Sequence, residues 1–222
     1  KRPFELKSDF DTFHAKSVII ASGASAKLLG LPNEAKLMGH GVSACATCDG
    51  AFFKKRDVLI VGAGDTAMEE AMFLTRHAAK VTVVHRSDAF RASKIMLERA
   101  RANPKIEWLL HRVVQDILAG PDGKVRAVKL FDPRTKEHSE IATDGIFIAI
   151  GHRPNSDLFR GVLDMDDVGY LRVHNGSYTS IDGVFAAGDV ADKVYRQAVT
   201  AAGMGCMAAI DAERWLELQN GH

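Results

Sequence analysis

The sequence lacks the features that mark membrane proteins, small secreted proteins and nucleic-acid-binding proteins. No apolar stretch approaches the roughly 20 residues that a membrane-spanning helix needs. The 29 lysines and arginines are balanced by 28 aspartates and glutamates, which leaves a formal net charge of +1 and no basic footprint for nucleic acid or an anionic membrane. Three cysteines among 222 residues do not make a secreted disulfide framework. These absences favour a cytoplasmic globular protein.

The composition and the order of apolar runs predict an α/β protein. Hydrophobic residues make up 46% of the chain and charged residues 26%, a balance that can fill a core. Apolar runs predict buried strands at 16–21, 57–61, 80–85, 145–150 and 183–187. Helical patterns cover 65–77, 92–102 and 196–218, and a hairpin is expected from 113–118 and 124–131. Strands that alternate with helices predict a parallel sheet.

A glycine-rich turn follows the strand at 57–61. The run Gly62-Ala63-Gly64-Asp65-Thr66-Ala67 has the G-x-G-x-x-A pattern between a strand and a helix. Gly62 permits a sharp turn, Gly64 lets the backbone approach a pyrophosphate, and Ala67 lets the helix pack closely on the strand. The phosphates would lie at the helix N-terminus, where unpaired N–H groups favour anions. The pattern indicates a dinucleotide site, and a glycine turn without a ligand is the alternative.

The end of the next strand indicates which dinucleotide is bound. A site for NAD expects an acid about 20 residues after the turn, to bind the ribose 2′-hydroxyl. Here the strand ends at His85 and is followed by Arg86 and, a few residues later, Arg91. Guanidinium groups match a 2′-phosphate in a bidentate manner, so the sequence favours NADPH. Arg86 and Arg91 as plain surface charges are the alternative, and Asp88 is a competing acid.

Cys45 and Cys48 form a Cys-x-x-Cys pair, and we interpret them as a redox-active dithiol. A structural zinc site needs four ligands, and the only other cysteine is the distant Cys206, which we expect in the core. A Cys-x-x-Cys beside a nucleotide fold is typical of a dithiol that cycles with a disulfide, and two unrelated packing cysteines are the alternative. Asp49 can move a proton to or from a thiolate, or can cap the next helix. Passing a hydride from nicotinamide to a disulfide requires a two-electron intermediary, which is usually a flavin.

Six segments together resemble the low-molecular-weight thioredoxin reductases. They are 43–50 (SACATCDG), the turn at Gly62, His85-Arg86, 151–155 (GHRPN), 184–190 (VFAAGDV) and 196–198 (RQA). The resemblance spans nearly the whole chain in the order of the family. It implies an α/β fold in which a Rossmann-like NADPH domain, residues 29–153, is inserted into a Rossmann-like FAD domain made of 1–28 and 154–222. It also implies electron transfer from NADPH through FAD and the dithiol to thioredoxin, in a homodimer.

The resemblance assigns roles to individual residues. Cys48 would lie nearest the flavin and attack the thioredoxin disulfide, Cys45 would resolve the mixed disulfide, and Asp49 would transfer the proton. The residues expected to hold NADPH are Gly62, Gly64, Asp65, Thr66, Arg86 and Arg91. Gly188 and Asp189 would bind the FAD ribityl-pyrophosphate region. Arg196, Gln197 and Ala198 would open the last helix, whose positive end favours the anionic reduced flavin.

The chain departs from the pattern of this family at two places. Ser87 stands where the family commonly has a second consecutive arginine, which affects the NADPH preference. The first strand of the FAD domain and its G-x-G-x-x-G turn are absent, so we expect a fragment with an incomplete FAD domain that holds FAD poorly. A related flavoprotein reductase of a peroxidase system and a non-catalytic nucleotide-binding module are the alternative functions.

Overall fold

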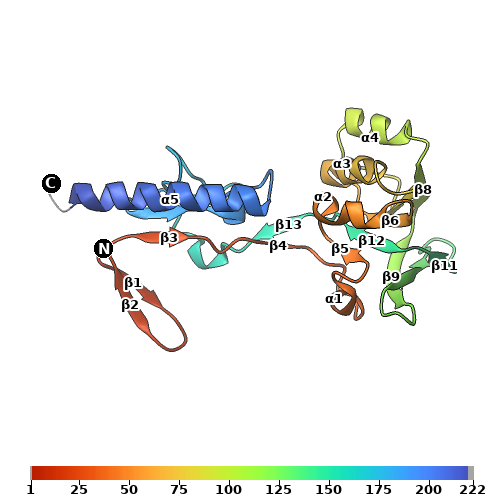
Figure 1. The fold of residues 1–222 in the computed structure, drawn as a ribbon, viewed down its shortest axis with the longest axis horizontal. Coiled ribbons are helices and arrows are strands. Elements are labelled where there is room, and N and C mark those ends of the chain that lie inside the picture. Colours follow the sequence, from red (N-terminus) through yellow and green to blue (C-terminus); the bar gives the residue numbers. More distant parts are fainter. Residues whose placement is uncertain (1, 220–222) are drawn as a thin grey trace. The chain divides into compact units, whose positions relative to one another are not determined.

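The computed structural model describes residues 2–219, and the chain divides into two compact units (Figure 1). The central unit is continuous in sequence and comprises Ala26–Gly151. The terminal unit combines Lys1–Ser25 with His152–His222. The chain therefore enters and leaves the central unit once each, and the terminal unit is assembled from both ends of the sequence.

A five-stranded parallel sheet forms the middle of the central unit. Its strands occur in the order β5 (Val42–Ser43), β12 (Gly145–Ile148), β6 (Asp57–Val61), β7 (Lys80–His85) and β8 (Ile106–Leu110). Most residues of β6, β7 and β12 are buried, as the continuous apolar runs predict for strands covered on both faces. The carboxyl ends of these strands lie at one edge of the sheet, and the glycine turn follows β6 at that edge.

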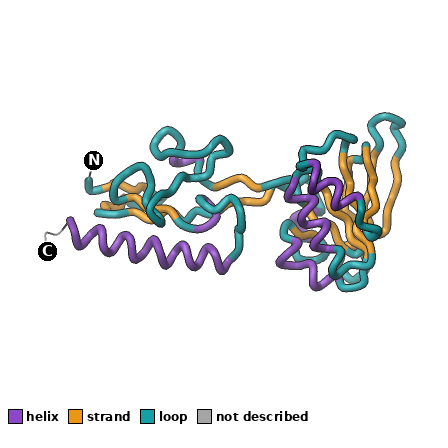
Figure 2. Tube along the Cα trace, turned by 90° about the horizontal axis from the view of Figure 1, so that it is seen from above, coloured by secondary structure: helices purple, strands orange, loops and turns teal. Residues whose placement is uncertain are grey.

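Helices cover one face of this sheet, and a second sheet covers the other. Figures 1 and 2 show α3 (Asp65–Leu74) and α4 (Lys94–Arg101) on one side. Val58 and Ile60 of β6 point toward them into a core with Met68. Leu59, between them in the sequence, joins the opposite core, as the two-residue period of a strand requires. That core is closed by a three-stranded antiparallel sheet of β9 (Val113–Ala119), β10 (Val125–Phe131) and β11 (His138–Ala142).

Three short helical segments precede β6 in the central unit. They are α1 (Glu34–Leu37), α2 (Ala46–Asp49) and the 3-10 turn η1 (Gly50–Phe53). The side chain of Glu34 is buried and accepts hydrogen bonds from the backbone N–H groups of Leu29, Gly30 and Leu31. This carboxylate satisfies three backbone donors that would otherwise be unpaired, and so fixes the entry of the chain into the central unit.

The terminal unit has shorter strands and one long helix. The pairs are β1 (Phe4–Lys7) with β2 (Thr12–Ala15), β3 (Val18–Ile20) with β14 (Val184–Ala186), and β4 (Ala24–Ala26) with β13 (His152–Pro154). The 3-10 turn η2 (Asp157–Phe159) follows β13, and a second one, η3 (Gly188–Val190), lies between β14 and α5 (Ala198–Gln219). Phe185 of β14 packs edge-on against Trp215 of α5, whose Nε1 donates to the Asp182 carboxylate at 2.7 Å. These contacts tie the helix to the strand pair.

The structure confirms the predicted α/β class with its parallel sheet and differs from the sequence analysis in detail. The strands β8, β11, β1 and β2 were not predicted; β11, β1 and β2 are largely exposed and polar, so they carry no apolar run. The last helix begins at Ala198 instead of Arg196, because Arg196 adopts a left-handed backbone with φ of 48°.

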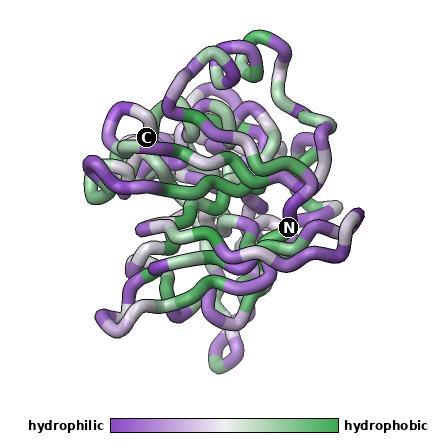
Figure 3. The backbone as a smooth tube through the Cα atoms, turned by 90° about the vertical axis from the view of Figure 1, so that its right-hand side faces the viewer, coloured by the Kyte–Doolittle hydropathy of each residue, from purple (hydrophilic) through white to green (hydrophobic). Residues whose placement is uncertain are grey.

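Cys206 is exposed on α5, so its interpretation as a core residue was wrong. Figure 3 shows the hydrophobic colour concentrated in the strands and the hydrophilic colour in most loops.

No helix within residues 2–219 is long and apolar enough to cross a membrane.

Candidate active site

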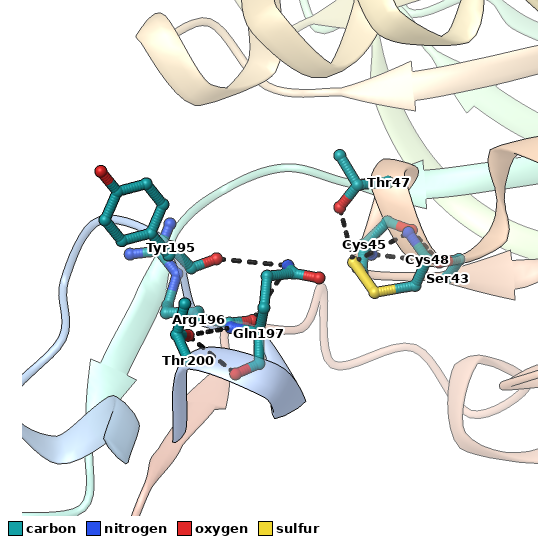
Figure 4. Close-up of a disulfide and its surroundings, with 8 residues drawn as sticks. All are labelled: Ser43, Cys45, Thr47, Cys48, Tyr195, Arg196, Gln197 and Thr200. Carbon is teal, nitrogen blue, oxygen red and sulfur yellow. Dashed lines mark hydrogen bonds between the residues drawn. A yellow bond between two sulfur atoms is a disulfide. The ribbon is translucent and has the colours of Figure 1, made fainter. Parts of the chain in front are cut away.

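Cys45 and Cys48 are joined by a disulfide in the central unit (Figure 4). Cys45 follows β5 in an extended conformation and is the N-cap of α2, while the fully buried Ala46 anchors that helix in the core. Ser43, at the end of β5, holds the preceding turn because its Oγ accepts the Cys45 N–H at 3.1 Å. Within the described residues, no group of three or more His, Cys, Asp or Glu side chains could hold a metal ion. The structure thus holds the pair as a disulfide, and its redox role stays a prediction.

The two sulfur atoms have different surroundings. Cys45 Sγ accepts the Cys48 N–H at 3.2 Å and lies 3.3 Å from Thr47 Oγ1. A disulfide sulfur carries no proton, so the Thr47 hydroxyl is the donor in this contact. Across residues 2–219, Cys48 Sγ accepts no hydrogen bond. Cys48 and Thr47 are exposed, whereas Cys45 is half-buried.

Asp49 is half-buried directly after the cysteine pair. Its backbone N–H donates to Cys45 O at 3.1 Å, and its side chain makes no capping hydrogen bond to the following 3-10 turn. The alternative reading of Asp49 as a helix cap thus has no supporting contact. A role in proton transfer stays a prediction.

The glycine turn after β6 is as tight as the sequence pattern requires. Gly62 has φ of 153°, and a Cβ at this position would lie 2.3 Å from the carbonyl oxygen of Ala149 and 2.8 Å from the Cβ of Ala67. Only glycine fits there, because both neighbours belong to the packed core. Gly64 precedes α3 and has open space around it. The first turn of α3 is thus approachable by a ligand, with Thr66 partly accessible beside it.

A cavity of about 530 Å³ lies beside this turn. Its lining includes Gly62 and Ala63 of the turn, His85, Arg86, Ser87 and Arg91 after β7, Arg112, and the apolar Leu29, Val61 and Ile150. The guanidinium groups of Arg86 and Arg91 form no hydrogen bond or ion pair with any other residue in the described part of the chain. Burial lowers the pKa of His85, opposed by its hydrogen bond to the Ala89 carbonyl oxygen and aided by the positive charges of Arg86 and Arg91. The cavity lining therefore combines apolar side chains with the guanidinium groups of Arg86 and Arg91.

Ser87, which stands in place of the second arginine of the family pattern, and the neighbouring Asp88 add no positive charge to the cavity. The Ser87 hydroxyl lies 3.2 Å from His85 Nε2 and 3.5 Å from the carbonyl oxygen of Ala89, within its own loop. Asp88 is exposed and lies 4.0 Å from His111, and it is not among the cavity residues. The competing acid identified from the sequence thus does not pair with either arginine.

Asp65 contacts the loop that carries Arg91. Its Oδ1 accepts the Ser93 N–H at 2.7 Å. The carbonyl oxygen of Ala63 accepts the N–H groups of Arg91 and Ala92 at 2.9 and 3.0 Å. Three consecutive backbone donors therefore bind the glycine turn, and they hold Arg91 against the cavity.

Arg112 is a cavity residue that the sequence analysis missed. It follows β8, and its backbone N–H donates to the carbonyl oxygen of His85 at 3.0 Å, next to the tip of β7. Its guanidinium is paired with the buried carboxylate of Asp132, which also binds Arg134 at 3.1 Å. The hydrogen bond from Arg134, opposed by burial and aided by the charge of Arg112, holds the pKa of Asp132 well below its usual range. Recognising β8 as a strand would have shown that Arg112 lies at its tip.

The terminal unit contains the residues expected to meet a flavin. Gly188 has φ of 73° directly after β14, and Asp189 Oδ1 is buried without a hydrogen-bond partner in residues 2–219. Asp192 accepts the N–H groups of Val194, Tyr195 and Arg196 at 2.9 to 3.1 Å. These bonds fix the loop before α5.

Gln197 lies at the N-terminus of α5, and its carbonyl oxygen accepts the Ala201 N–H at 2.9 Å. Its side chain donates to the carbonyl oxygens of Tyr195 and Arg196 at 3.2 and 3.1 Å (Figure 4). Of the three residues that were expected to open the helix, only Ala198 is helical. Arg196 and Gln197 form the turn that leads into it.

The chain matches known proteins along nearly all of its length. Residues 2–205 match the family described as pyridine nucleotide-disulphide oxidoreductase. The sequence is 56% identical over 211 residues to a thioredoxin reductase of Mycolicibacterium smegmatis, covering 95% of this chain and 67% of the relative. A thioredoxin reductase of Rickettsia conorii is 52% identical over 97% of this chain and 71% of its own. The chain belongs to the thioredoxin reductase family.

Solved structures of this family have the same fold. The thioredoxin reductase from Streptococcus pyogenes matches with a TM-score of 0.91 at 42% identity, covering 96% of this chain and 69% of that one. The thioredoxin reductase from Giardia duodenalis matches with a TM-score of 0.89 at 40% identity. Thioredoxin reductases are FAD- and NADPH-binding oxidoreductases, so the family, fold class and cofactors inferred from the sequence are confirmed.

Proposed function

We propose that this chain reduces the disulfide of thioredoxin with electrons from NADPH, by way of FAD and the Cys45–Cys48 dithiol. The observation that carries the proposal is the disulfide of the Cys-x-x-Cys pair in the same compact unit as an arginine-lined cavity beside the glycine turn. FAD, when bound, supplies the two-electron transfer between nicotinamide and a disulfide. The rival functions, a peroxidase-system reductase and a non-catalytic module, have no comparable observation in their favour.

The central unit fits NADPH. The dinucleotide pyrophosphate would lie on Gly62, Gly64 and Thr66, because α3 begins there with unpaired N–H groups. Arg86 and Arg91 would bind the 2′-phosphate with guanidinium groups that have no other partner among the described residues. Asp65 would contribute indirectly, through its bond to the Ser93 N–H.

The terminal unit has residues that fit FAD. The buried Oδ1 of Asp189 lacks a partner among residues 2–219, and a ribityl hydroxyl is a donor of the kind that it needs. Gly188 brings the backbone close to the same place in a conformation that favours glycine. Arg196, Gln197 and Ala198 would present the N-terminus of α5 to the ring, where the partial positive charge favours an anion.

The dithiol would exchange with thioredoxin in two steps. The thiolate of Cys48, the more exposed cysteine, attacks a sulfur of the thioredoxin disulfide, whose other sulfur leaves as a thiolate. The thiolate of Cys45 then attacks Cys48 Sγ, which restores the Cys45–Cys48 disulfide and releases reduced thioredoxin. Asp49 is placed beside the pair to exchange a proton with the leaving thiolate. The partner is thioredoxin, and we propose a homodimer in the cytoplasm, where thiols are kept reduced.

The exchange step can be tested on this chain without flavin. The chain is reduced, freed of reductant and mixed with oxidised thioredoxin, in a Cys206→Ser background because Cys206 is an exposed thiol. We expect Cys45→Ser to accumulate a mixed disulfide between Cys48 and thioredoxin, since the resolving thiol is missing. Cys48→Ser should accumulate much less. Absence of any mixed disulfide from both variants, measured by non-reducing electrophoresis and mass spectrometry, would contradict the proposal.

A further inference from the structure

The hydrogen bonds around the disulfide are asymmetric. Cys45 Sγ accepts from the Thr47 hydroxyl at 3.3 Å and from the Cys48 N–H at 3.2 Å, whereas Cys48 Sγ accepts none within residues 2–219 (Figure 4). A neutral disulfide sulfur is a weak acceptor, so these contacts contribute little in the oxidised state. A thiolate in the same place would be a charged acceptor, and both bonds would strengthen.

We propose that the Thr47 hydroxyl, together with the Cys48 N–H, stabilises the thiolate of Cys45 and makes Cys45 the leaving group when the disulfide is opened. Thr47 is then a catalytic residue, since its oxygen touches a reacting sulfur. The inference deepens the proposed function and rests on it for its biological meaning. It assigns chemistry to a side chain between the two cysteines that neither the motif nor the family resemblance singled out.

The electrons and protons of the step balance for a dithiol reductant such as dithiothreitol. One thiolate of the reductant attacks Cys48 Sγ and forms a mixed disulfide, and the Cys45–Cys48 bond breaks. Its electron pair goes to Cys45 Sγ, which leaves as a thiolate between the Thr47 hydroxyl and the Cys48 N–H. The second thiolate of the reductant then displaces Cys48, and the reductant becomes a cyclic disulfide. In the reverse direction the same Cys45 thiolate resolves the mixed disulfide.

The local backbone holds Thr47 ready for this role. Cys45 is extended at the N-cap while residues 46–49 are helical. This change of backbone conformation brings the hydroxyl of Thr47 next to Cys45 Sγ. The Cys45 N–H is held by Ser43 Oγ at 3.1 Å, and the Asp49 N–H by Cys45 O at 3.1 Å. The donors therefore need no rearrangement as charge develops on the sulfur, which is the condition under which such donors assist a reaction.

The test measures the pKa of each cysteine separately. In a Cys48→Ser, Cys206→Ser background only the Cys45 thiol remains, and the backbone N–H of position 48 is retained. The pKa is taken from the pH dependence of the iodoacetamide alkylation rate, for Thr47, Thr47→Ser and Thr47→Val. We expect Thr47→Val to raise the pKa of Cys45 by about half a unit to one unit, since each hydrogen bond to a charged form shifts a pKa by roughly that amount. Thr47→Ser, which keeps the hydroxyl, should leave it unchanged.

The mirror experiment separates this role from a general effect on the helix. In a Cys45→Ser, Cys206→Ser background, Thr47→Val should leave the pKa of Cys48 where it was. In the Cys206→Ser background, reduction of the disulfide by dithiothreitol should be slower for Thr47→Val than for Thr47→Ser. An unchanged Cys45 pKa in Thr47→Val, or an equal shift of both cysteines, would overturn the inference. These measurements use neither flavin nor thioredoxin, so their failure is distinct from failure of the proposed function.

Discussion

Replacing Asp65 with alanine removes the oxygen that accepts the Ser93 N–H at 2.7 Å. The hydrogen bonds from the Arg91 and Ala92 N–H groups to the carbonyl oxygen of Ala63 remain. The loop that carries Arg91 therefore stays bound to the glycine turn, with two hydrogen bonds instead of three. A hydrogen bond to a charged group contributes about 1.5–3 kcal/mol when it is shielded. Asp65 and Ser93 are exposed, so about 1 kcal/mol is the appropriate scale, or about fivefold in a binding constant.

We expect this loss to fall on the 2′-phosphate alone. The assay is isothermal titration of the chain with 2′,5′-ADP and with AMP, and the measured quantity is the ratio of the two affinities. Asp65→Ala should lower that ratio about fivefold. The matched control Asp65→Asn keeps an acceptor oxygen and should keep the ratio. Arg91→Ala should lower the ratio by about tenfold, because it removes a charge-assisted contact with the phosphate.

The combination of the two substitutions decides between a positioning role and a general structural role. If Asp65 acts by holding Arg91, Asp65→Ala adds little to the loss of ratio already caused by Arg91→Ala. The reasoning is refuted if the two losses multiply in the double variant. It is refuted as well if Asp65→Ala weakens 2′,5′-ADP and AMP by the same factor, since the ratio would then be unchanged.

Two further substitutions test the cavity and its support. Gly62→Ala should abolish binding of 2′,5′-ADP and AMP and lower the free energy of unfolding by about 1–3 kcal/mol, because the added Cβ meets the Ala149 carbonyl oxygen at 2.3 Å; calorimetry and urea denaturation check this. Gly64→Ala adds a Cβ that meets no protein atom, so it is the control for the loss of stability alone. Asp132→Asn should destabilise the chain at pH 7. The pKa of Asp132 is lowered in the folded state, so its carboxylate stabilises the fold above the unfolded pKa and this contribution is lost as the pH falls toward the folded pKa. The difference between Asp132→Asn and the parent in urea denaturation should therefore shrink below about pH 4, and a difference that is constant with pH would contradict the pairing with Arg112 and Arg134.

The parts of the site that could be predicted are those that lie close together in the sequence. The turn at Gly62 could be recognised because a buried strand, the glycines and a helix follow one another directly, and the same holds for the pair Cys45 and Cys48. The hydrogen bond between the Ser93 N–H and Asp65 joins residues that are 28 positions apart in the sequence. Neither residue type indicates that the two are in contact. Arg112 was missed because β8 was not predicted, and its partner Asp132 is 20 residues away in the loop after β10.

Three of the strands that were not predicted, β11, β1 and β2, carry no apolar run, whereas β8 is apolar and was missed although its sequence is IEWLL. β11 and the hairpin of β1 and β2 are mostly exposed, and they are held by backbone hydrogen bonds to a neighbour instead of by burial. The start of α5 was misplaced because the Asp192 carboxylate binds the three N–H groups before the helix, and Arg196 takes a left-handed backbone in that turn. Helical periodicity carries no information about such a turn.

The discontinuity of the terminal unit has a consequence for the order of folding. Every strand of the five-stranded sheet lies within Ala26–Gly151, so the central unit closes its core with contacts from one continuous stretch. The terminal unit must instead pair Val18 with Val184, and this contact costs more loop-closure entropy. During synthesis from the N-terminus, the unit with Cys45 and Cys48 can be complete while the other still lacks half of its central strand pair. The surroundings of Cys45 and Cys48 within the central unit can therefore form before β3 pairs with β14.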